Sequence, residues 1–231
     1  MRSRESRVRY IAYFDIMGFK DRVYREPHKS IDEMLDYVLE ELHWPFDLEP
    51  PKGQRRKRGS HFLSYHVVFS DTILFYSRDT KDLDLSALLH QSHSLLFNCL
   101  LAGIPIKGAL AKGRFTADPI KSKYFGLPLI DAYQLAEEVH FYGAAMHHSI
   151  ESDVDRIAKD PNFSWITVKK GPIPMKDGKI THYYLSRKSL RNTDVSSLDS
   201  EYITPLYHQV SGRIRKYVDN TEWLYSQEGP Y

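Results

Sequence analysis

The chain has 231 residues, of which 42% are hydrophobic and 13% aromatic, so it can form one large domain, or a domain of about 150 residues with extensions, and it does not have the composition of a disordered protein. Its 32 basic and 30 acidic side chains nearly balance, which argues against a protein that binds nucleic acid through bulk charge. No stretch approaches the roughly 18 consecutive apolar residues of a membrane span, and the basic N-terminus runs into a short strand instead of the apolar stretch of a signal peptide, so we expect a cytoplasmic protein without membrane contact.

The first predicted elements are a strand and a helix. Residues 8–16, VRYIAYFDI, are rich in β-branched and aromatic types, which predicts a buried strand that stops at Met17–Phe19. After a polar loop, Ser30 has the character of an N-cap, and apolar residues recur at helical spacing over 30–43. These residues are predicted to form an amphipathic helix. Residues 45–60, with three prolines and two glycines, are predicted to be a loop.

The middle of the chain predicts a hairpin and a second helix. The stretch FLSYHVVFSDTILFYS predicts two strands that meet at Ser70-Asp71, which places a carboxylate at a tight turn. Residues 83–101 are strongly apolar and predict a central helix that Gly103 ends. Cys99, the single cysteine, lies in this run. It is expected to be a small buried hydrophobe, and no disulfide can form within one chain.

The remaining elements are predicted to be strands and helices in turn. Residues 104–115 predict a strand with glycines at bends, and about 128–148 a third helix with an apolar inner side. Two strands then flank a loop that contains Asp177-Gly178, which predicts a hairpin. A last helix is predicted near 201–218, with a tail after it.

The order of these elements is β-α-β-β-α-β, followed by helix, strands and helix. It predicts an α+β fold with a ferredoxin-like core sheet, helices on one face, and a C-terminal elaboration of a helix and strands. We expect residues 1–185 to form the main domain, and residues 186–231 to form a helical extension packed on it.

Two aspartates stand where this order brings the chain together. Asp15 ends the first strand, where burial penalises an ionised carboxyl unless its charge is compensated. Asp71 lies in the hairpin turn, which the β-α-β-β order places beside the end of that strand. Two carboxylates that meet need a cation between them, and hard oxygen ligands favour Mg²⁺ or Mn²⁺ with substrate phosphates completing the shell. The sequence therefore predicts a divalent-metal site for a nucleoside triphosphate.

The motifs around these aspartates resemble a known family. The segments F-D-I-M-G-F and F-S-D-T, whose aspartates Asp15 and Asp71 are 56 positions apart, resemble the catalytic domain of class III nucleotide cyclases. Further segments of similar type are Gly108-Ala109 to Gly113 and Tyr124-Phe125-Gly126 with Asp131-Ala132 and Leu135. The resemblance covers roughly residues 8–185.

The resemblance implies a homodimer with two composite sites between the subunits. It implies two divalent cations per site, Mg²⁺ or Mn²⁺, held by Asp15, Asp71 and the backbone carbonyl of Ile16, with both aspartates catalytic. The triphosphate would rest on the turn from Phe14 to Phe19. The expected substrate contacts are Phe14, Met17, Gly18, Phe19, Tyr65, Thr72 and Lys107.

Two departures from the family pattern affect the substrate. Purine cyclases read the base with a Lys on the strand before the second Asp, where this chain has Val67, with Tyr65 one step further along the same face. They also carry an Asn and an Arg on the third helix, where residues 130–134 read I-D-A-Y-Q. A small aromatic pocket without the Lys resembles the Pycsar pyrimidine cyclases of bacterial anti-phage defence. We therefore expect conversion of UTP, or of CTP, to the 3′,5′-cyclic nucleotide, a second messenger.

The missing Arg leaves the phosphate charge short of a donor. Lys107, Lys112 and Arg114 are the candidate replacements. The same absence is compatible with an alternative, a degenerate cyclase domain that binds a nucleotide as a sensor.

Other functions agree less well with the sequence. A palm-type domain such as a diguanylate cyclase would carry a G-G-[DE]-x-F hairpin, which is absent. An RNA-binding protein would rest on the basic loop Arg55–Arg58, which a solvated loop also explains. His147-His148 on one helix would point about 100° apart, so they are poor joint metal ligands.

Overall fold

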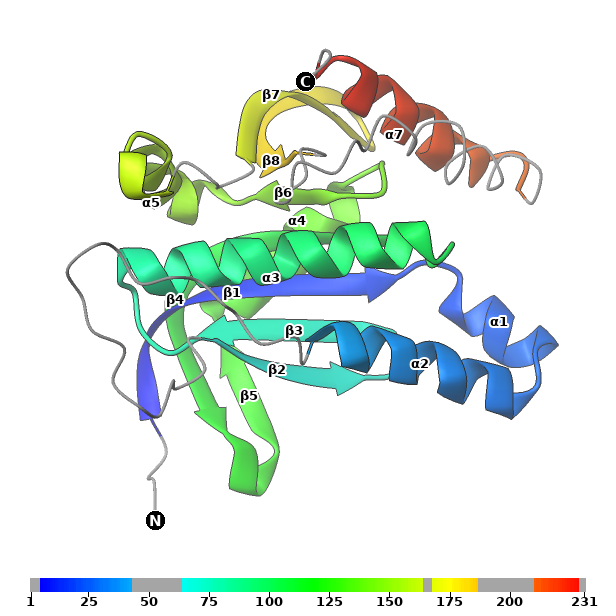
Figure 1. The fold of residues 1–231 in the computed structure, drawn as a ribbon, viewed down its shortest axis with the longest axis horizontal. Helices are drawn as coiled ribbons and strands as arrows, with labels where there is room; N and C mark the ends of the chain where they lie inside the picture. The colour runs from blue at the N-terminus through cyan, green and yellow to red at the C-terminus, as the bar shows by residue number, and fades with distance from the viewer. Residues whose placement is uncertain (1–4, 43–63, 164–167, 187–209, 229–231) are drawn as a thin grey trace.

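The chain forms strands and helices around one mixed sheet (Figure 1). The computed structural model describes residues 5–42, 64–163, 168–186 and 210–228. The strands are β1 (Glu5–Ile16), β2 (Ser64–Phe69), β3 (Thr72–Ser77), β4 (Ile106–Asp118), β5 (Lys123–Gly126), β6 (Ala144–Met146), β7 (Val168–Met175) and β8 (Gly178–Leu185). The helices are α1 (Phe19–Arg25), α2 (His28–Leu42), α3 (Asp82–Leu101), α4 (Leu127–Glu138), α5 (His148–Ala158) and α7 (Arg215–Ser226), with 3-10 turns at Pro119–Lys121 and Pro161–Phe163.

The sheet contains the predicted core. Its strand order over the described residues is β2-β3-β1-β4-β6-β8-β7, with β5 paired to β4. The first four positions, β2-β3-β1-β4, are the antiparallel order of a ferredoxin-like βαββαβ unit. β6 then adds in parallel to β4, and the β7–β8 hairpin extends the sheet. The α+β prediction is confirmed.

Alternation along β1 divides the sheet into two faces. Tyr10, Ala12 and Phe14 point to the side that α2 and α3 cover, and all three are fully buried in the main core. Ile11, Tyr13 and Asp15 point to the opposite side, which we call the site face. Helix α4 packs on the site face through small side chains, so helices lie on both sides of the sheet, and the expectation of helices on one face is wrong.

Two of the predicted helices have different bounds. Helix α2 begins at His28, so Ser30 lies inside it, and the expected polar loop before it contains α1. The helix predicted over 128–148 ends at Glu138, because Val139 turns extended, is fully buried and bridges to Met175 of β7. The rest of that prediction holds β6 and the start of α5.

The last helix lies further along the chain than predicted. α7 runs over Arg215–Ser226 and includes the expected tail with Trp223 and Tyr225. Its inner residues Val218, Leu224 and Tyr225 are almost fully buried in the main core. The predicted basic loop at 45–60 and residues 201–209 lie outside the described residues.

The described helices are too short or too polar to span a bilayer. Within the described ranges, none is both long and apolar enough to cross a bilayer. In α3, Cys99 is fully buried, as predicted for a small core hydrophobe.

Gly108 provides a test of how closely β4 packs on β1. A Cβ there would lie 2.4 Å from the Tyr13 carbonyl oxygen and 2.5 Å from Cδ1 of Phe14. We expect Gly108→Ala to lower the free energy of unfolding by roughly 1–3 kcal/mol through overpacking, measured by urea denaturation. Gly171→Ala on β7 is the matched control, because its nearest atom would be 3.9 Å away. Equal midpoints for the two variants would contradict this account of the packing.

Candidate active site

Asp15 lies on the site face at the end of the central strand β1. Across the sheet it pairs with Thr72 of β3 on one side and with Lys107 of β4 on the other. Side chains of directly opposed residues point to the same face. The three side chains therefore meet in one row, as expected for Asp15 and for the predicted substrate contacts Thr72 and Lys107.

A backbone hydrogen bond brings Asp71 to the same place. The β2–β3 turn consists of Ser70 and Asp71, and Ser70 adopts a left-handed backbone with φ 59°. The carbonyl of Asp71 accepts the amide of Ile16 at 2.9 Å. Since Ile16 follows Asp15 directly, this bond fixes the turn at the end of β1. The predicted meeting of the two aspartates is present in the structure.

The surroundings of Asp15 make its ionisation costly. Burial is the largest cause that raises the pKa of Asp15 to about 6; the negative charge of Asp71 acts in the same direction, and the Lys107 ammonium opposes the shift. A raised carboxyl pKa means that the ionised form lacks compensation within the chain. The pair therefore has the charge and the oxygen donors to accept a cation.

The protein side chains alone do not complete a metal shell. Over the described ranges, no group of three or more His, Cys, Asp or Glu side chains is placed to hold a metal ion. Asp15 and Asp71 supply two carboxylates, and the carbonyl of Ile16 is the additional donor that we predicted. This oxygen-only set fits a hard cation that takes its remaining ligands from water or from phosphate.

Lys107 is a buried basic side chain at this site. Its side chain is 4% exposed, and its Nζ lies 3.9 Å from Oε1 of Glu137 at the end of α4. Burial lowers the pKa of Lys107, while Glu137 and Asp15 oppose this shift. A buried ammonium beside Asp15 is placed to meet an anion that binds there.

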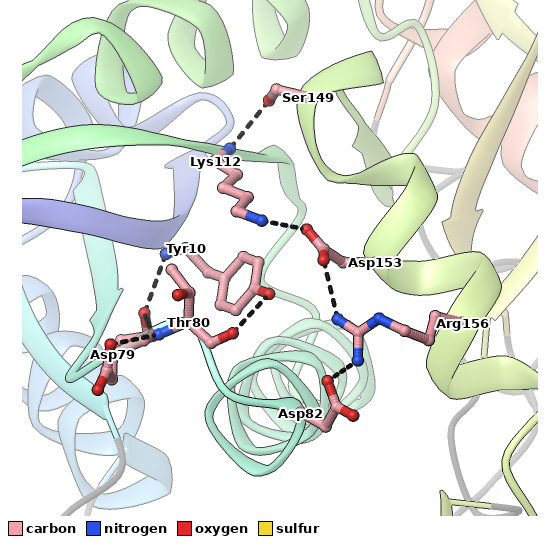
Figure 2. A network of polar contacts seen from close by, with 9 residues as sticks. Tyr10, Asp79, Thr80, Asp82, Lys112, Ser149, Asp153 and Arg156 are labelled. Atoms are coloured by element: carbon pink, nitrogen blue, oxygen red, sulfur yellow. Dashed lines mark hydrogen bonds and ion pairs between the residues drawn. The ribbon is translucent and has the colours of Figure 1, made fainter.

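The other two candidate cations lie elsewhere. Lys112 points to the opposite face, where its Nζ forms a 2.6 Å ion pair with Asp153 of α5, which also binds Arg156 at 2.9 Å (Figure 2). Arg114 is exposed and lies seven residues along β4 from Lys107, which is roughly 23 Å in a strand. Neither side chain lies beside Asp15.

The turn from Phe14 to Phe19 offers fewer amides than expected. The amide of Ile16 binds Asp71, and the amide of Met17 donates to the Pro105 carbonyl at 2.8 Å. Gly18 has φ 74° and begins α1, and the first amides of a helix have no partner within the helix. The turn can therefore offer an anion the amides of Gly18 and Phe19. The Phe14 and Phe19 side chains are core residues.

The predicted base-reading positions lie on the site face. Val67 is opposite Leu74, and Tyr65 is opposite Tyr76, on whose ring it stacks with centroids 5.2 Å apart. Along the strand direction, Val67 lies roughly 7 Å and Tyr65 roughly 13 Å from the row of Asp15. Both side chains are partly exposed. They line a partly apolar surface beside Asp15.

Tyr133 of α4 and the two adjacent histidines lie in different surroundings. Tyr133, on the stretch without Asn and Arg, packs edge-on against Tyr13 with ring centroids 5.5 Å apart. His147 is the N-cap of α5, and its ring lies 4.0 Å from that of His148, so the expected helical divergence of the pair is wrong. His147 Nδ1 lies 4.0 Å from Asp131.

Two residues of the site were not predicted from the sequence. Glu137, at the end of α4, reaches Lys107 and also lies 3.9 Å from Nζ of Lys176. Tyr217 of α7 places its ring 5.8 Å from the same Lys107 Nζ. The residue type of Glu137 and its place on α4 could have suggested a partner for a buried cation. No local pattern marks Tyr217.

The Asp15–Asp71 pair should make the metal-free protein less stable. The unfolded carboxyl has a pKa of 3.8 and the folded one about 6, so the folded state pays the ionisation cost fully above pH 6 and loses it as the pH falls toward 4. In EDTA, we expect Asp15→Asn to raise the unfolding free energy by roughly 1–3 kcal/mol at pH 7.5. The gain should shrink at pH 5.5. Asp36→Asn, on the exposed side of α2, is the control; a gain that does not change with pH would contradict the assignment.

Comparisons with known proteins give a likeness of fold. No family model matches this chain, and no curated protein matches it in sequence. Among solved structures, the catalytic core of a rhodopsin-guanylyl cyclase with converted specificity, in complex with ATPαS, matches with a TM-score of 0.53 and 13% identity, over 79% of this chain and 97% of that one. The fold of this chain is therefore that of a nucleotide cyclase catalytic core.

Proposed function

We propose that this protein is a nucleotide cyclase that converts a pyrimidine nucleoside triphosphate, UTP or CTP, to its 3′,5′-cyclic monophosphate and pyrophosphate. The observation that carries the proposal is the convergence of Asp15, Asp71 and Lys107 at one edge of a cyclase-type sheet. Asp15 has a charge that its surroundings leave undercompensated. A simple binding module has little reason to keep two carboxylates together.

Each group at this edge has a task in the reaction. Mg²⁺ or Mn²⁺ bound by Asp15, Asp71 and the Ile16 carbonyl would supply Lewis-acid activation of the ribose 3′-hydroxyl and charge neutralisation of the pyrophosphate. Lys107 would donate to the phosphate oxygens from a buried position, where a charge–charge contact is stronger than in water. The amides of Gly18 and Phe19 would bind further phosphate oxygens.

The pyrimidine preference rests on the strand β2. Val67 stands where purine cyclases carry a base-reading Lys, so no cation on β2 meets the purine edge. Tyr65, supported by its stack on Tyr76, offers an aromatic surface and a hydroxyl to the base. UTP is our first choice and CTP the second.

A second copy of the chain would complete the site. Several large apolar side chains are exposed around the site face, including Phe69 at 80%, Leu127 at 65% and Ile130 at 52%. Exposed apolar side chains beside the proposed metal site suit an interface that a symmetric partner buries. We propose a homodimer with composite sites. The partner subunit would supply phosphate donors, because α4 has no Asn and Arg at the positions where purine cyclases carry them. The cyclic product would act as a second messenger in anti-phage defence.

The alternative is a nucleotide-binding sensor without turnover. It is favoured by the sequence of α4, where Ile130 and Gln134 occupy the region of the transition-state Asn and Arg. Binding without product formation is the property that separates it from the cyclase.

Turnover tests the proposal directly. Purified protein is incubated with each of the four ribonucleoside triphosphates and Mn²⁺, and products are identified by mass spectrometry; cyclic UMP or cyclic CMP is expected. Asp71→Ala should reduce the rate at least 100-fold, while the turn keeps its place because the backbone carbonyl binds Ile16. Binding of all four nucleotides without any product would leave the sensor as the better description.

The role of Lys107 has its own matched test. We expect Lys107→Met to lower kcat/KM for UTP by roughly 10²-fold, because a buried phosphate donor is lost. Arg114→Met, on the same strand but exposed and distant, should retain the wild-type value. Similar losses in the two variants would show that nonspecific charge, and not the position of Lys107, supports the reaction.

A further inference from the structure

Helix α7 is fixed to the segment that leads into β6. The amide of Tyr142 donates to Oγ1 of Thr221 at 2.8 Å, and the side-chain amide of Asn220 donates to the His140 carbonyl at 2.7 Å. The Tyr225 hydroxyl donates to the Tyr142 carbonyl at 3.2 Å. Thr221 is fully buried, so its bond is shielded from water and holds the helix in one position.

This attachment places the aromatic ring of Tyr217 near Lys107 at the candidate site. Tyr217 stacks on Tyr142 with centroids 5.8 Å apart and meets the His140 ring edge-on at 4.3 Å. Nζ of Lys107 lies over the same ring, 5.8 Å from its centroid. In Figure 1 the N-terminal end of α7 lies on the same side of the molecule as the C-terminal end of β1.

Lys107 needs such a neighbour. Its ammonium is buried, yet its nearest ion-pair partner is Glu137 at 3.9 Å, which Lys176 shares at the same distance. Asp15 and Glu138 are further carboxylates whose charge acts on Lys107, so a flexible lysine has competing positions. The ring of Tyr217 lies under the ammonium, and its face attracts the positive charge.

We propose that Tyr217 is a positioning residue of the nucleotide site, through which α7 holds the Lys107 ammonium beside Asp15, ready for an anionic phosphate. The inference rests on the proposed function only in naming the anion as the triphosphate of a nucleotide. It gives the C-terminal helix a part in the site that neither the sequence motifs nor the fold comparison assign. Burial, followed by the charges of Glu137 and Asp15, raises the pKa of Tyr217, which agrees with a place in this cluster.

The proposal distinguishes the ring from the hydroxyl. A cation interacts with the face of the aromatic ring, so Tyr217→Phe should keep kcat/KM for UTP within about twofold of wild type. Tyr217→Leu removes the ring and should lower kcat/KM by roughly 3- to 30-fold. Tyr217→Met, which keeps a long apolar side chain, is a second ring-free variant if the leucine variant folds poorly.

The test uses a matched control and a double mutant. Trp223→Leu removes another ring of α7 that covers a lysine, since Lys179 Nζ lies 3.1 Å from its centroid; it should leave kcat/KM unchanged. In the Lys107→Met background, Tyr217→Leu should cause no further loss, because Tyr217 acts through Lys107. Binding of inorganic triphosphate with Mg²⁺, measured by calorimetry, should follow the same order of variants.

The two readouts separate this inference from the proposed function. If no nucleotide turns over but triphosphate binding falls in Tyr217→Leu and not in Tyr217→Phe, cyclisation is wrong and the positioning role stands. If turnover occurs and Tyr217→Leu matches wild type, the positioning role is wrong and the cyclase stands. Equal losses in the Phe and Leu variants, a similar loss in Trp223→Leu, an undiminished loss in the Lys107→Met background, or no triphosphate binding by the wild type would each overturn the inference.

Discussion

One backbone hydrogen bond determines the geometry of the candidate site. The amide of Ile16 donates to the carbonyl of Asp71, and it thereby joins the end of the central strand to the tip of an edge hairpin. The bond brings the two carboxylates together at a partly buried place, where burial and the charge of Asp71 make ionisation of Asp15 more costly. The left-handed backbone of Ser70 in the same turn is a second local cost. A fold that holds Asp15 and Asp71 together against both costs is suited to binding a cation between them.

The two faces of the sheet hold different groups of polar side chains. Lys107 and Lys112 are five positions apart on one strand, and an odd separation sends their side chains to opposite faces. Lys112 joins a polar network with Asp153 and Arg156 that ties α5 to β4 (Figure 2). Lys107 joins Asp15 on the site face. Two lysines in one short segment therefore have different surroundings. The alternation of side chains along the strand determines which of them lies on the site face.

The sequence was a good guide where the signal was local. Alternation and aromatic content identified β1, and the Ser70-Asp71 break identified the hairpin, so the Asp15–Asp71 pair and the side of Tyr65 and Val67 could be predicted. The parallel strand β6 could not, because three residues, Ala144–Met146, carry no measurable period and merge with the helical pattern before them. Tyr217 was out of reach for another reason: it is 110 positions from Lys107, and only the packing of α7 against Tyr142 brings the two together.

The burial of Cys99 has a practical consequence for following α7. It is the only cysteine of the chain, and it is fully enclosed within α3, so thiol reagents in the native state have no native target at the surface. A cysteine introduced at the exposed Lys216 would then be the single labelling position, next to Tyr217 and at the start of the helix. A fluorophore or spin label there would report directly on the docking of α7, in the intact protein and without a cysteine-free background.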